Sequence, residues 1–438
     1  MTQTAERVQK LSRDYWRLWW ANAISSTGDG AFVAALPLLA VTITRDPRLV
    51  SVVTAATFLP WMLISLPAGA VVDRYDRATL MWRAKAVQAA VVTIIAVLVV
   101  VHQANIEVLA AGGLLLGSAE VIFSNAAQSV LPALVPPELL PKANGSQQVS
   151  LTVGESFLGP PAGSLLFAAA AALPFGLDAV SFAGSAALLA RLPRTGSPRT
   201  GLPATGYSGT EISGTGQSQS QSQNQGQSQS LRAQIAEGLR WLIKNRLLRV
   251  VAVLLGVYNF ANQMGQAILV LLATQTLHVS ARGYGLLLAA SAVGSVVGGL
   301  VNPILTRRMG MLPSLVLPAV VTAVAFVGIG LAPGPIVVAA LLAVQGFSVT
   351  MWNVVTISLR QRVVPGHLLG RVNSVYRMLG WGLMPLGALA GGFVAHAAGL
   401  RAPYIVAGLL TGLSALAALP LLLAATRMQD DKQDHERD

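Results

Sequence analysis

Residues 69–77 read Gly-Ala-Val-Val-Asp-Arg-Tyr-Asp-Arg and lie between two long apolar runs. Four charged residues, Asp73, Arg74, Asp76 and Arg77, interrupt the apolar sequence over this short distance. So few residues cannot leave a bilayer, form a domain and return, so we interpret the stretch as a tight hairpin between two membrane spans. Arg and Lys stay on the cytoplasmic side of short loops, so the hairpin also predicts the topology. An ordinary positive-inside loop is the simpler interpretation of the same residues.

The composition points to a membrane protein. The 438-residue chain is 53% hydrophobic and 11% charged, with a mean hydropathy of +0.60. Soluble proteins carry about a quarter charged residues. We therefore expect an all-α polytopic membrane protein. The net charge of +12 comes from Arg and Lys clustered between apolar runs, so we expect membrane lipid, and no nucleic acid, as a partner.

Several kinds of chemistry are absent from the sequence. There is no cysteine, which excludes disulfides and thiolate metal sites, and the five histidines have no metal-ligand spacing. The chain has no G-x-x-x-x-G-K-[ST], G-x-S-x-G or H-E-x-x-H motif. We therefore expect no enzymatic activity, no metal and no cofactor, and we find no sign of an ATP-driven pump.

Twelve apolar segments have the length of a membrane span. They cover approximately residues 17–44, 49–72, 79–102, 107–131, 146–170, 173–190, 247–276, 283–305, 312–332, 334–358, 371–396 and 402–425. With both termini in the cytoplasm, four of the 30 Arg and Lys residues fall on the outer side: Arg45, Arg48, Arg282 and Arg401. The others, including Lys85 beside the first hairpin, count as cytoplasmic. This asymmetry predicts a multi-pass protein of the cytoplasmic (inner) membrane.

The chain divides into two six-helix halves. Residues 1–190 form the first half, and residues 250–425 form the second. Residues 191–230 are rich in Gly, Ser and Gln and predict a disordered cytoplasmic linker. Residues 231–249 predict an amphipathic helix on the inner membrane surface, and residues 426–438 a cytoplasmic tail. Segments 135–144 and 364–373 share Val, Pro, Leu, Leu, a basic residue and Asn in register, which indicates pseudo-symmetric halves around a central site.

Polar residues form stripes within four of the predicted spans. Polar side chains are costly in hydrocarbon, so we expect them to line a cavity. The alternative is that they bind helices together by hydrogen bonds. The stripes are Asn22, Ser25, Ser26 and Asp29; Glu120, Ser124 and Gln128; Asn259, Asn262, Gln263 and Gln266; and Gln345, Trp352, Asn353 and Thr356.

Asp29 and Glu120 are the strongest candidates for function, because each lies near the middle of its span. A carboxyl that is neutral in one conformation and charged in another would couple proton movement to a conformational change. We expect them to bind protons or to recognise a cation; the alternative is a structural role through hydrogen bonds. Asp178, Glu107 and Arg401 fall at span ends, where we expect interfacial positions. Few aromatic residues occur near the proposed cavity (Trp352, Tyr258, Phe123 and Phe260), so no flat ligand is specified.

The pattern G-x-x-x-D-R-x-D-R at residues 69–77 resembles the signature loop between helices 2 and 3 of major facilitator superfamily transporters. The resemblance implies the major facilitator fold, in which helices 1, 4, 7 and 10 line the central cavity. It also implies that the loop is a latch used in switching between inward-open and outward-open forms. Asp73 and Arg77 would form the latch, Gly69 would let helices approach, and Arg74 and Asp76 would pair with neighbouring helix ends.

The stretch Gly154 to Gly163 carries a Gly159-Pro160-x-x-Gly163 core that resembles the antiporter motif of facilitator-type drug exporters. Ser164 stands where that motif usually has a second glycine. Glycines allow close helix approach and proline bends a helix. Glu155 in this stretch is either a third titrating group or a helix-packing residue.

Within the superfamily, the chain is most similar to the branch of enterobactin exporters and macrolide efflux proteins. Residues 69–77, 128–140 with Ala143-Asn144, and 237–242 carry this resemblance. It implies a proton-coupled antiporter that exports small amphiphilic molecules, such as drugs or siderophores, by alternating access. We expect small-molecule substrate and protons as partners, and a monomer. A nutrient importer or facilitator on the same fold is one alternative, and a non-transporting sensor or scaffold is another.

Overall fold

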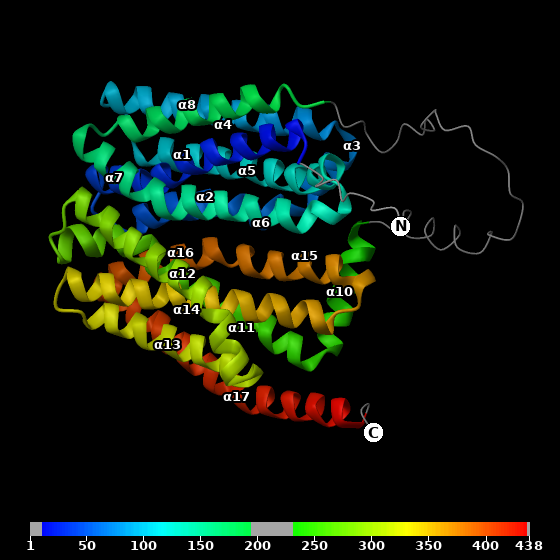
Figure 1. The fold of residues 1–438 in the computed structure, drawn as a ribbon. Helices are drawn as coiled ribbons and strands as arrows, with labels where there is room; N and C mark the ends of the chain where they lie inside the picture. Colours follow the sequence, from blue (N-terminus) through cyan, green and yellow to red (C-terminus); the bar gives the residue numbers. More distant parts are fainter. Residues whose placement is uncertain (1–10, 194–230, 436–438) are drawn as a thin grey trace, which may run out of the picture.

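A computed structural model describes residues 11–193 and 231–435, and its regular structure there is entirely helical (Figure 1). The first half contains α1 (Arg13–Ile43), α2 (Pro47–Leu63), α3 (Ser65–Arg74), α4 (Arg77–Val100), α5 (Ile106–Leu134), η1 (Pro137–Leu139), α6 (Leu140–Leu151), η2 (Thr152–Leu158), α7 (Gly159–Ala169) and α8 (Leu173–Leu189). The second half contains α10 (Leu231–Lys244), α11 (Arg246–Leu271), η3 (Leu272–Thr276), α12 (Ala281–Met309), α13 (Met311–Leu331), α14 (Pro335–Val363), α15 (Gly366–Gly382), α16 (Met384–Ala398) and α17 (Ala402–His435).

The predicted twelve-span fold class is confirmed. In the described residues, nine helices are long and apolar enough to cross a membrane, and Pro47–Leu63 and Leu173–Leu189 are shorter apolar helices. Four of the described spans are built from more than one element: α2 with α3, α6 with η2 and α7, α11 with η3, and α15 with α16. Helix α17 continues through residues 426–435, which were expected to form a tail.

The bundle has two distinct ends. We call the end at which α1 begins the basic end, since Arg13, Arg74 and Arg307 lie at helix ends there, and the opposite one the far end. The start of α1, the last described turn of α17 and α10 lie at the basic end (Figure 1). Helix α3 ends at Arg74 and α4 begins at Arg77, so residues 69–77 contain a tight hairpin, as predicted. Asp76 caps α4 by accepting a hydrogen bond from the Thr79 amide at 2.8 Å.

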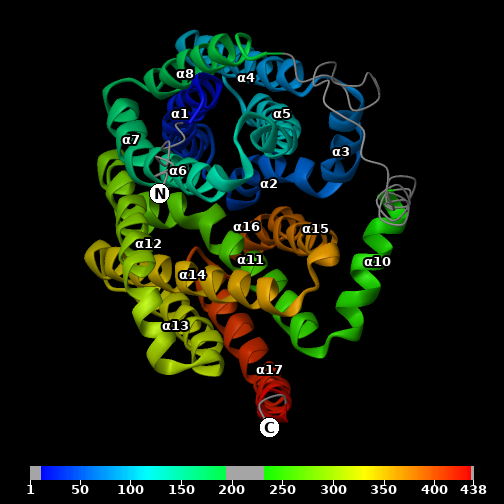
Figure 2. The ribbon, with the colours of Figure 1, turned by 45° about the vertical axis from the view of Figure 1, so that its right-hand side comes forward.

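The two halves lie side by side, and each has its own internal packing (Figure 2). Helix α1 packs on α8 and α7 in the first half, and α12 packs on α14 in the second. The halves meet mainly where α2 packs on α16 and α7 packs on α12.

Small residues let the halves approach closely near the far end. A Cβ atom built on Gly285 of α12 would lie 1.7 Å from Ser164 Oγ of α7. One built on Gly392 of α16 would lie 2.0 Å from Ser51 Oγ of α2. Real Cβ atoms essentially never show such distances, so a larger residue at either position would force the neighbouring helix or its serine to move.

The connection between the halves departs from its predicted boundary. Residues 194–230, most of the predicted linker, lie outside the described residues. Helix α10 ends at Lys244, and Asn245 caps the next helix by accepting a hydrogen bond from the Leu248 amide at 3.0 Å. The expectation of one amphipathic helix over residues 231–249 is therefore wrong, because an asparagine N-cap starts α11 at Arg246. Helix α10 packs on α15, where Glu237 and Arg371 form an ion pair.

Candidate functional site

Lys85 of α4 lies at the centre of a charged cluster inside the first half. Its side chain is 1% exposed, and its Nζ lies 3.3 Å from Glu120 Oε2 on α5 and 3.9 Å from Asp29 Oδ2 on α1. Gln88, one helical turn further along α4, donates a hydrogen bond to Glu120 Oε2 at 3.1 Å. The side chains of Asp29 and Glu120 keep 32% and 36% of their surface exposed. Asp29 and Glu120 are therefore brought together, and they are the accessible members of the cluster.

Aromatic rings and a further acid surround the same ammonium group. The ring centroids of Phe123 and Phe182 lie 4.3 Å and 4.6 Å from Lys85 Nζ, close enough for cation–π attraction. Asp178 of α8 is 1% exposed, and its charge acts on Lys85. Asp178 Oδ1 accepts a hydrogen bond from Ser181 Oγ at 3.2 Å, and Oδ2 has no partner among the described residues.

The sequence-based positions of Lys85 and Asp178 at the membrane surface are wrong. Helix α4 begins at Arg77, so eight residues, or about 12 Å of rise, separate Lys85 from that end. Asp178 faces α1: a Cβ atom built on Gly28 would lie 2.4 Å from Asp178 Oδ1. The sequence did contain a signal for this cluster. Lys85 precedes Gln88 by three residues within an apolar run, so both side chains lie on the same face of the helix and can contact the same acid.

Glu155 lies at the edge of this cluster. It is exposed, and the charges of Glu120 and Lys85 reach its carboxyl. Its backbone supports α1, since a Cβ atom built on Gly30 would lie 2.6 Å from the Glu155 carbonyl oxygen. Glu155 therefore combines a packing position with electrostatic contact to the cluster.

The charges in the cluster do not balance when every group is ionised. One buried ammonium group lies within 4 Å of the carboxylates of Asp29 and Glu120, and Asp178 and Glu155 interact electrostatically with the same group. Unpaired charge is costly in a low-dielectric interior. The arrangement can hold a proton or a second cation and can release it when the surroundings change.

The Gly154–Gly163 stretch forms the surface on which α1 packs. A π-helix, η2, covers Thr152–Leu158, and Gly159 and Pro160 open α7. Cβ atoms built on Gly154, Gly159 and Gly163 would lie 2.3–2.5 Å from atoms of α1. Close approach of α1 to α7 therefore depends on these glycines, and π-helical turns often mark functional sites.

The other polar residues of α1 bind helices together. Asn22 Nδ2 donates a hydrogen bond to Gln147 Oε1 of α6 at 2.8 Å. Ser26 Oγ lies 3.5 Å from the Ser150 carbonyl oxygen of α6, and Ser25 donates to the Asn22 carbonyl oxygen. All three side chains are buried. The contacts of Asn22 and Ser26 join α1 to α6 and match the helix-bundling alternative, whereas the hydrogen bond of Ser25 stays within α1.

The stripes of the second half meet each other. Gln345 Nε2 of α14 donates a hydrogen bond to Asn262 Oδ1 of α11 at 3.0 Å. The side chains divide by exposure: Gln263, Gln345, Trp352 and Thr356 are buried, Asn259, Asn262 and Gln266 are half-buried, and Asn353 is exposed.

Arg377 of α15 crosses from the second half to the first. Its guanidinium donates hydrogen bonds to Asn125 Oδ1 at 2.8 Å and to Gln128 Oε1 at 3.3 Å, both on α5. Gln128 Nε2 in turn lies 3.5 Å from Ser124 Oγ. Sequence reasoning counted Arg377 with the basic residues of the cytoplasmic side and missed this bridge, because the contact joins residues about 250 positions apart.

The predicted latch is partly described. Arg77 Nη1 donates a hydrogen bond to the Ser129 carbonyl oxygen of α5 at 3.1 Å, and Arg74 is exposed. The side chain of Asp73 lies outside the described part of the chain. A Cβ atom built on Gly69 would contact nothing within 4 Å, so glycine is not needed there for helix approach in this conformation.

Comparison with known proteins identifies the fold family. The model of the family "Major Facilitator Superfamily" matches residues 18–384 and 251–438. The chain belongs to the major facilitator superfamily. Among curated members, the multidrug efflux pump Tap of Mycobacterium tuberculosis is 26% identical over 417 residues, with 92% of each chain covered.

Solved structures of transporters share the superfamily fold. The nucleoside transporter NupG matches with a TM-score of 0.69 and 13% identity, covering 94% of this chain and 99% of NupG. A bacterial homologue of the iron transporter ferroportin, in an inward-facing state, matches with a TM-score of 0.70 and 16% identity, covering 95% and 99%. The protein is therefore a multi-pass membrane transporter of the major facilitator type, a class of transporters and not of enzymes.

Proposed function

We propose that the protein is a proton-coupled antiporter that exports small amphiphilic molecules across the inner membrane by alternating access. In this proposal both termini are cytoplasmic, the working unit is a monomer, and the coupling ion is the proton. The cluster of Asp29, Glu120 and Asp178 around Lys85 is the observation that carries the coupling part. Similarity to Tap, which is named a multidrug efflux pump, supports the export part.

The coupling argument rests on charge balance and access. Lys85 can neutralise one carboxylate, so a second carboxylate of the cluster keeps a proton unless water or a cation reaches it. The side chains of Asp29 and Glu120 keep about a third of their surface exposed. Water that enters when the protein changes conformation would therefore reach these two acids before the buried Asp178. Helix α1 carries Asp29 and packs on α7 through the glycines of the antiporter-like stretch. Movement of α1 against α7 would then alter how strongly the cluster holds its proton.

A nutrient importer or facilitator is the second candidate, because NupG, named a nucleoside transporter, has the same fold. Everted membrane vesicles separate the two. An exporter accumulates substrate in everted vesicles when a proton gradient is imposed, whereas an importer does not.

The coupling residues are tested with Asp29→Asn and Glu120→Gln in the same vesicles, after a susceptibility screen has supplied a substrate. We expect gradient-driven accumulation to fall by at least about tenfold in each variant, because the substituted amide can no longer bind and release a proton. Substrate exchange without a gradient should be retained.

Glu107→Gln is the matched control, because Glu107 lies on the same helix as Glu120 but is exposed in the first turn of α5. It should transport as the parent protein does. Gradient-driven transport that is unchanged in both Asp29→Asn and Glu120→Gln, at equal expression, would refute proton coupling through this cluster.

A further inference from the structure

A groove on the first half, which we call the lateral groove, lies over α1. It has a volume of about 750 Å³ and an almost entirely apolar lining. Helix α1 packs on both of its walls, which are α6 with η2 on one side and α8 on the other (Figure 2). Trp20, Val149 and Val180 line it and are more than half exposed. Because exposed apolar side chains within a span face hydrocarbon, the lateral groove opens to the bilayer.

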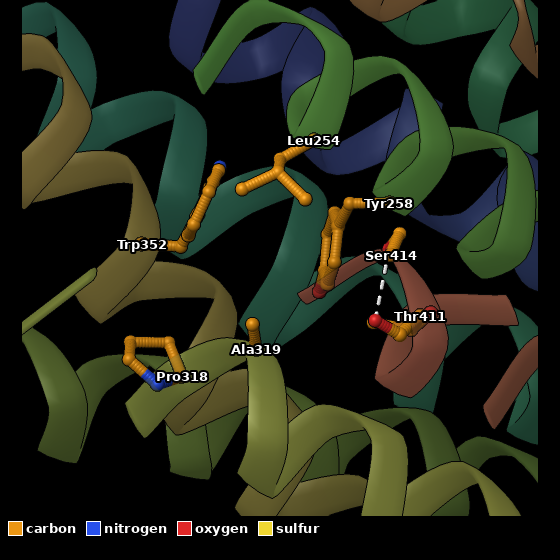
Figure 3. Close-up of a pocket in the computed structure, with 7 residues that line it drawn as sticks. All are labelled: Leu254, Tyr258, Pro318, Ala319, Trp352, Thr411 and Ser414. Carbon is orange, nitrogen blue, oxygen red and sulfur yellow. Dashed lines mark hydrogen bonds between the residues drawn. The ribbon is translucent and has the colours of Figure 1, made fainter. Parts of the chain in front are cut away.

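A cavity in the core of the second half is of a different kind. Tyr258 of α11 and Trp352 of α14 lie on either side of it, with ring centroids 6.5 Å apart (Figure 3). Its volume of about 10 Å³ has room for one water molecule. The lateral groove, in contrast, has the volume of a ligand site.

The second half contains a smaller counterpart of the lateral groove. The offset between Asn22 and Asn259 relates α1 to α11, and the offset between Asn144 and Asn373 relates α6 to α15 and α8 to α17. The equivalent space between α11, α15 and α17 has a volume of about 250 Å³. Four lining positions carry a smaller side chain in the first half: Ala23 for Phe260, Ser150 for Leu379, Gly154 for Leu383 and Ser181 for Leu410. The first half therefore keeps open a space that its own repeat fills.

The inner wall of the lateral groove touches the acid cluster. Gly28 and Ser181 both line the groove. A Cβ atom built on Gly28 would lie 2.1 Å from Ser181 Oγ and 2.4 Å from Asp178 Oδ1. Asp178 is buried, and its Oδ2 has no partner among the described residues. Water in the groove would hydrate this carboxyl, whereas a hydrocarbon chain would keep water away from it.

Positive charge lies where the lateral groove reaches the basic end. Arg13 begins α1 and Arg191 follows α8, and both side chains are exposed. Arg17 donates a hydrogen bond to the Arg191 carbonyl oxygen at 3.3 Å, so these ends of α1 and α8 are adjacent. Trp20 lies about 10 Å of rise beyond Arg13, at the depth where tryptophans mark the edge of the hydrocarbon. The exposed arginines are therefore at the level of lipid headgroups.

We propose that the lateral groove binds one acyl chain of an anionic phospholipid, whose headgroup lies beside Arg13 and Arg191. Bilayer lipid is the occupant because the groove continues the membrane-facing surface of the spans and because the two arginines complement a phosphate. The bound chain seals the membrane side of Asp178 against water. This lipid site goes beyond the proposed export and depends on neither the transported molecule nor its direction.

The experiment measures photolabelling of the purified full-length protein in vesicles of phosphatidylethanolamine and phosphatidylglycerol, without a proton gradient. The probe is a phosphatidylglycerol with a diazirine in one acyl chain. Peptide mass spectrometry compares labelling of residues 149–153 with labelling of Leu300, which is 73% exposed on α12 and lies outside the groove.

Filling the lateral groove should exclude the probe. Gly184 lines the groove, and a Cβ atom built there meets nothing within 4 Å, so Gly184→Leu occupies the space without a clash. We expect relative labelling to fall at least about fivefold, because close-packed groups cannot share a volume. Ala23→Phe installs the residue of the second half and should act in the same way.

Two controls make the result specific. Gly176→Leu changes a glycine of the same helix whose Cβ would also meet nothing within 4 Å, but Gly176 does not line the groove. Its labelling should stay within about twofold of the parent protein. Combined Arg13→Gln and Arg191→Gln should lower phosphatidylglycerol labelling at least about fivefold, since one arginine near an anionic headgroup contributes about that factor. Labelling by a diazirine phosphatidylcholine should not change in this variant.

Two results would overturn the inference. Equal relative labelling in Gly184→Leu, Ala23→Phe and Gly176→Leu would make the groove ordinary lipid-facing surface. Labelling that tetraphenylphosphonium abolishes, and that excess unlabelled phosphatidylglycerol leaves unchanged, would assign the groove to a transported cation. If gradient-driven export is absent but Gly184→Leu still loses the label, the proposed function fails and the lipid site stands.

Discussion

At the residue scale, Lys85 carries the charge on which the first half depends. It contacts Glu120 and Asp29 and lies between two phenylalanine rings, with almost no access to solvent. The cluster therefore has two functions in our interpretation: it holds α1, α4 and α5 together, and it stores a proton. A structural and a coupling role are separable by experiment, because stability and transport are different measurements.

Removal of Lys85 should destabilise the protein. In Lys85→Met the carboxylates lose their counter-charge, and breaking a buried ion pair in this way costs on the order of 3 kcal/mol. Adding Glu120→Gln should restore part of the loss, because one fewer carboxylate is left unpaired. Thermal unfolding in detergent measures both variants. Arg83→Met, at an exposed position of the same helix, is the control, and a melting temperature for Lys85→Met equal to that of Arg83→Met would contradict the interpretation.

Asp46 lies outside the spans, and its carboxyl should not affect how transport depends on pH. It caps α2, and hydrogen bonds from Arg48 lower the pKa of its carboxyl to about 2. Because the folded pKa lies below the usual value of about 3.9, Asp46 contributes stability above that value and loses it as the pH falls through about 2. It stays ionised from pH 5 to 8. Asp46→Asn should therefore leave the midpoint of the transport–pH profile in place, and a shifted midpoint in this variant would contradict the assignment.

At the scale of elements, close packing near the far end contrasts with a side-chain bridge nearer the basic end. Glycines 285 and 392 bring α12 and α16 into backbone-range contact with α7 and α2. Arg377, in contrast, reaches α5 through a long side chain. Backbone packing is rigid and a long side chain is adaptable, so we expect the basic end to open more readily from this conformation.

Loss of the Arg377 bridge should favour opening of the basic end. In Arg377→Gln the two hydrogen bonds to Asn125 and Gln128 are lost. A cysteine placed at Ser124 should then be alkylated at least about tenfold faster, because a hydrogen bond to a charged group contributes about 1.5–3 kcal/mol. The chain contains no cysteine, so a single engineered one has no background. Arg371→Gln, on the same helix, breaks a contact within the second half and should leave the rate unchanged; equal rates in both variants would argue against the bridge.

At the scale of the whole molecule, the distribution of Arg and Lys predicts which end faces the cytoplasm. Tyr75 lies in the hairpin at the basic end and is 60% exposed, and Gln103 is exposed in the connection between α4 and α5 at the far end. In Tyr75→Cys, an impermeant maleimide should label everted vesicles and not intact cells. In Gln103→Cys the pattern should be reversed. Labelling of Tyr75→Cys in intact cells would show that the topology is opposite to the predicted one and that the proposed export direction is wrong.

The sequence by itself determined the fold class and the hairpin at residues 69–77. It could do so because these properties depend on local composition: about 20 apolar residues are needed for a span, and charges end it. It also selected Asp29 and Glu120, since an acid in the middle of an apolar segment needs a partner.

Only the tertiary structure decided what those acids contact. Lys85 and Asp178 looked interfacial in sequence, and they are buried next to the partly exposed Asp29 because helices far apart in the chain converge there. The bridge from Arg377 and the spacing of Tyr258 from Trp352 were equally hidden. Their geometry is set by how helices pack and rotate against each other, and the periodicity of a single helix carries no information about the facing side chain.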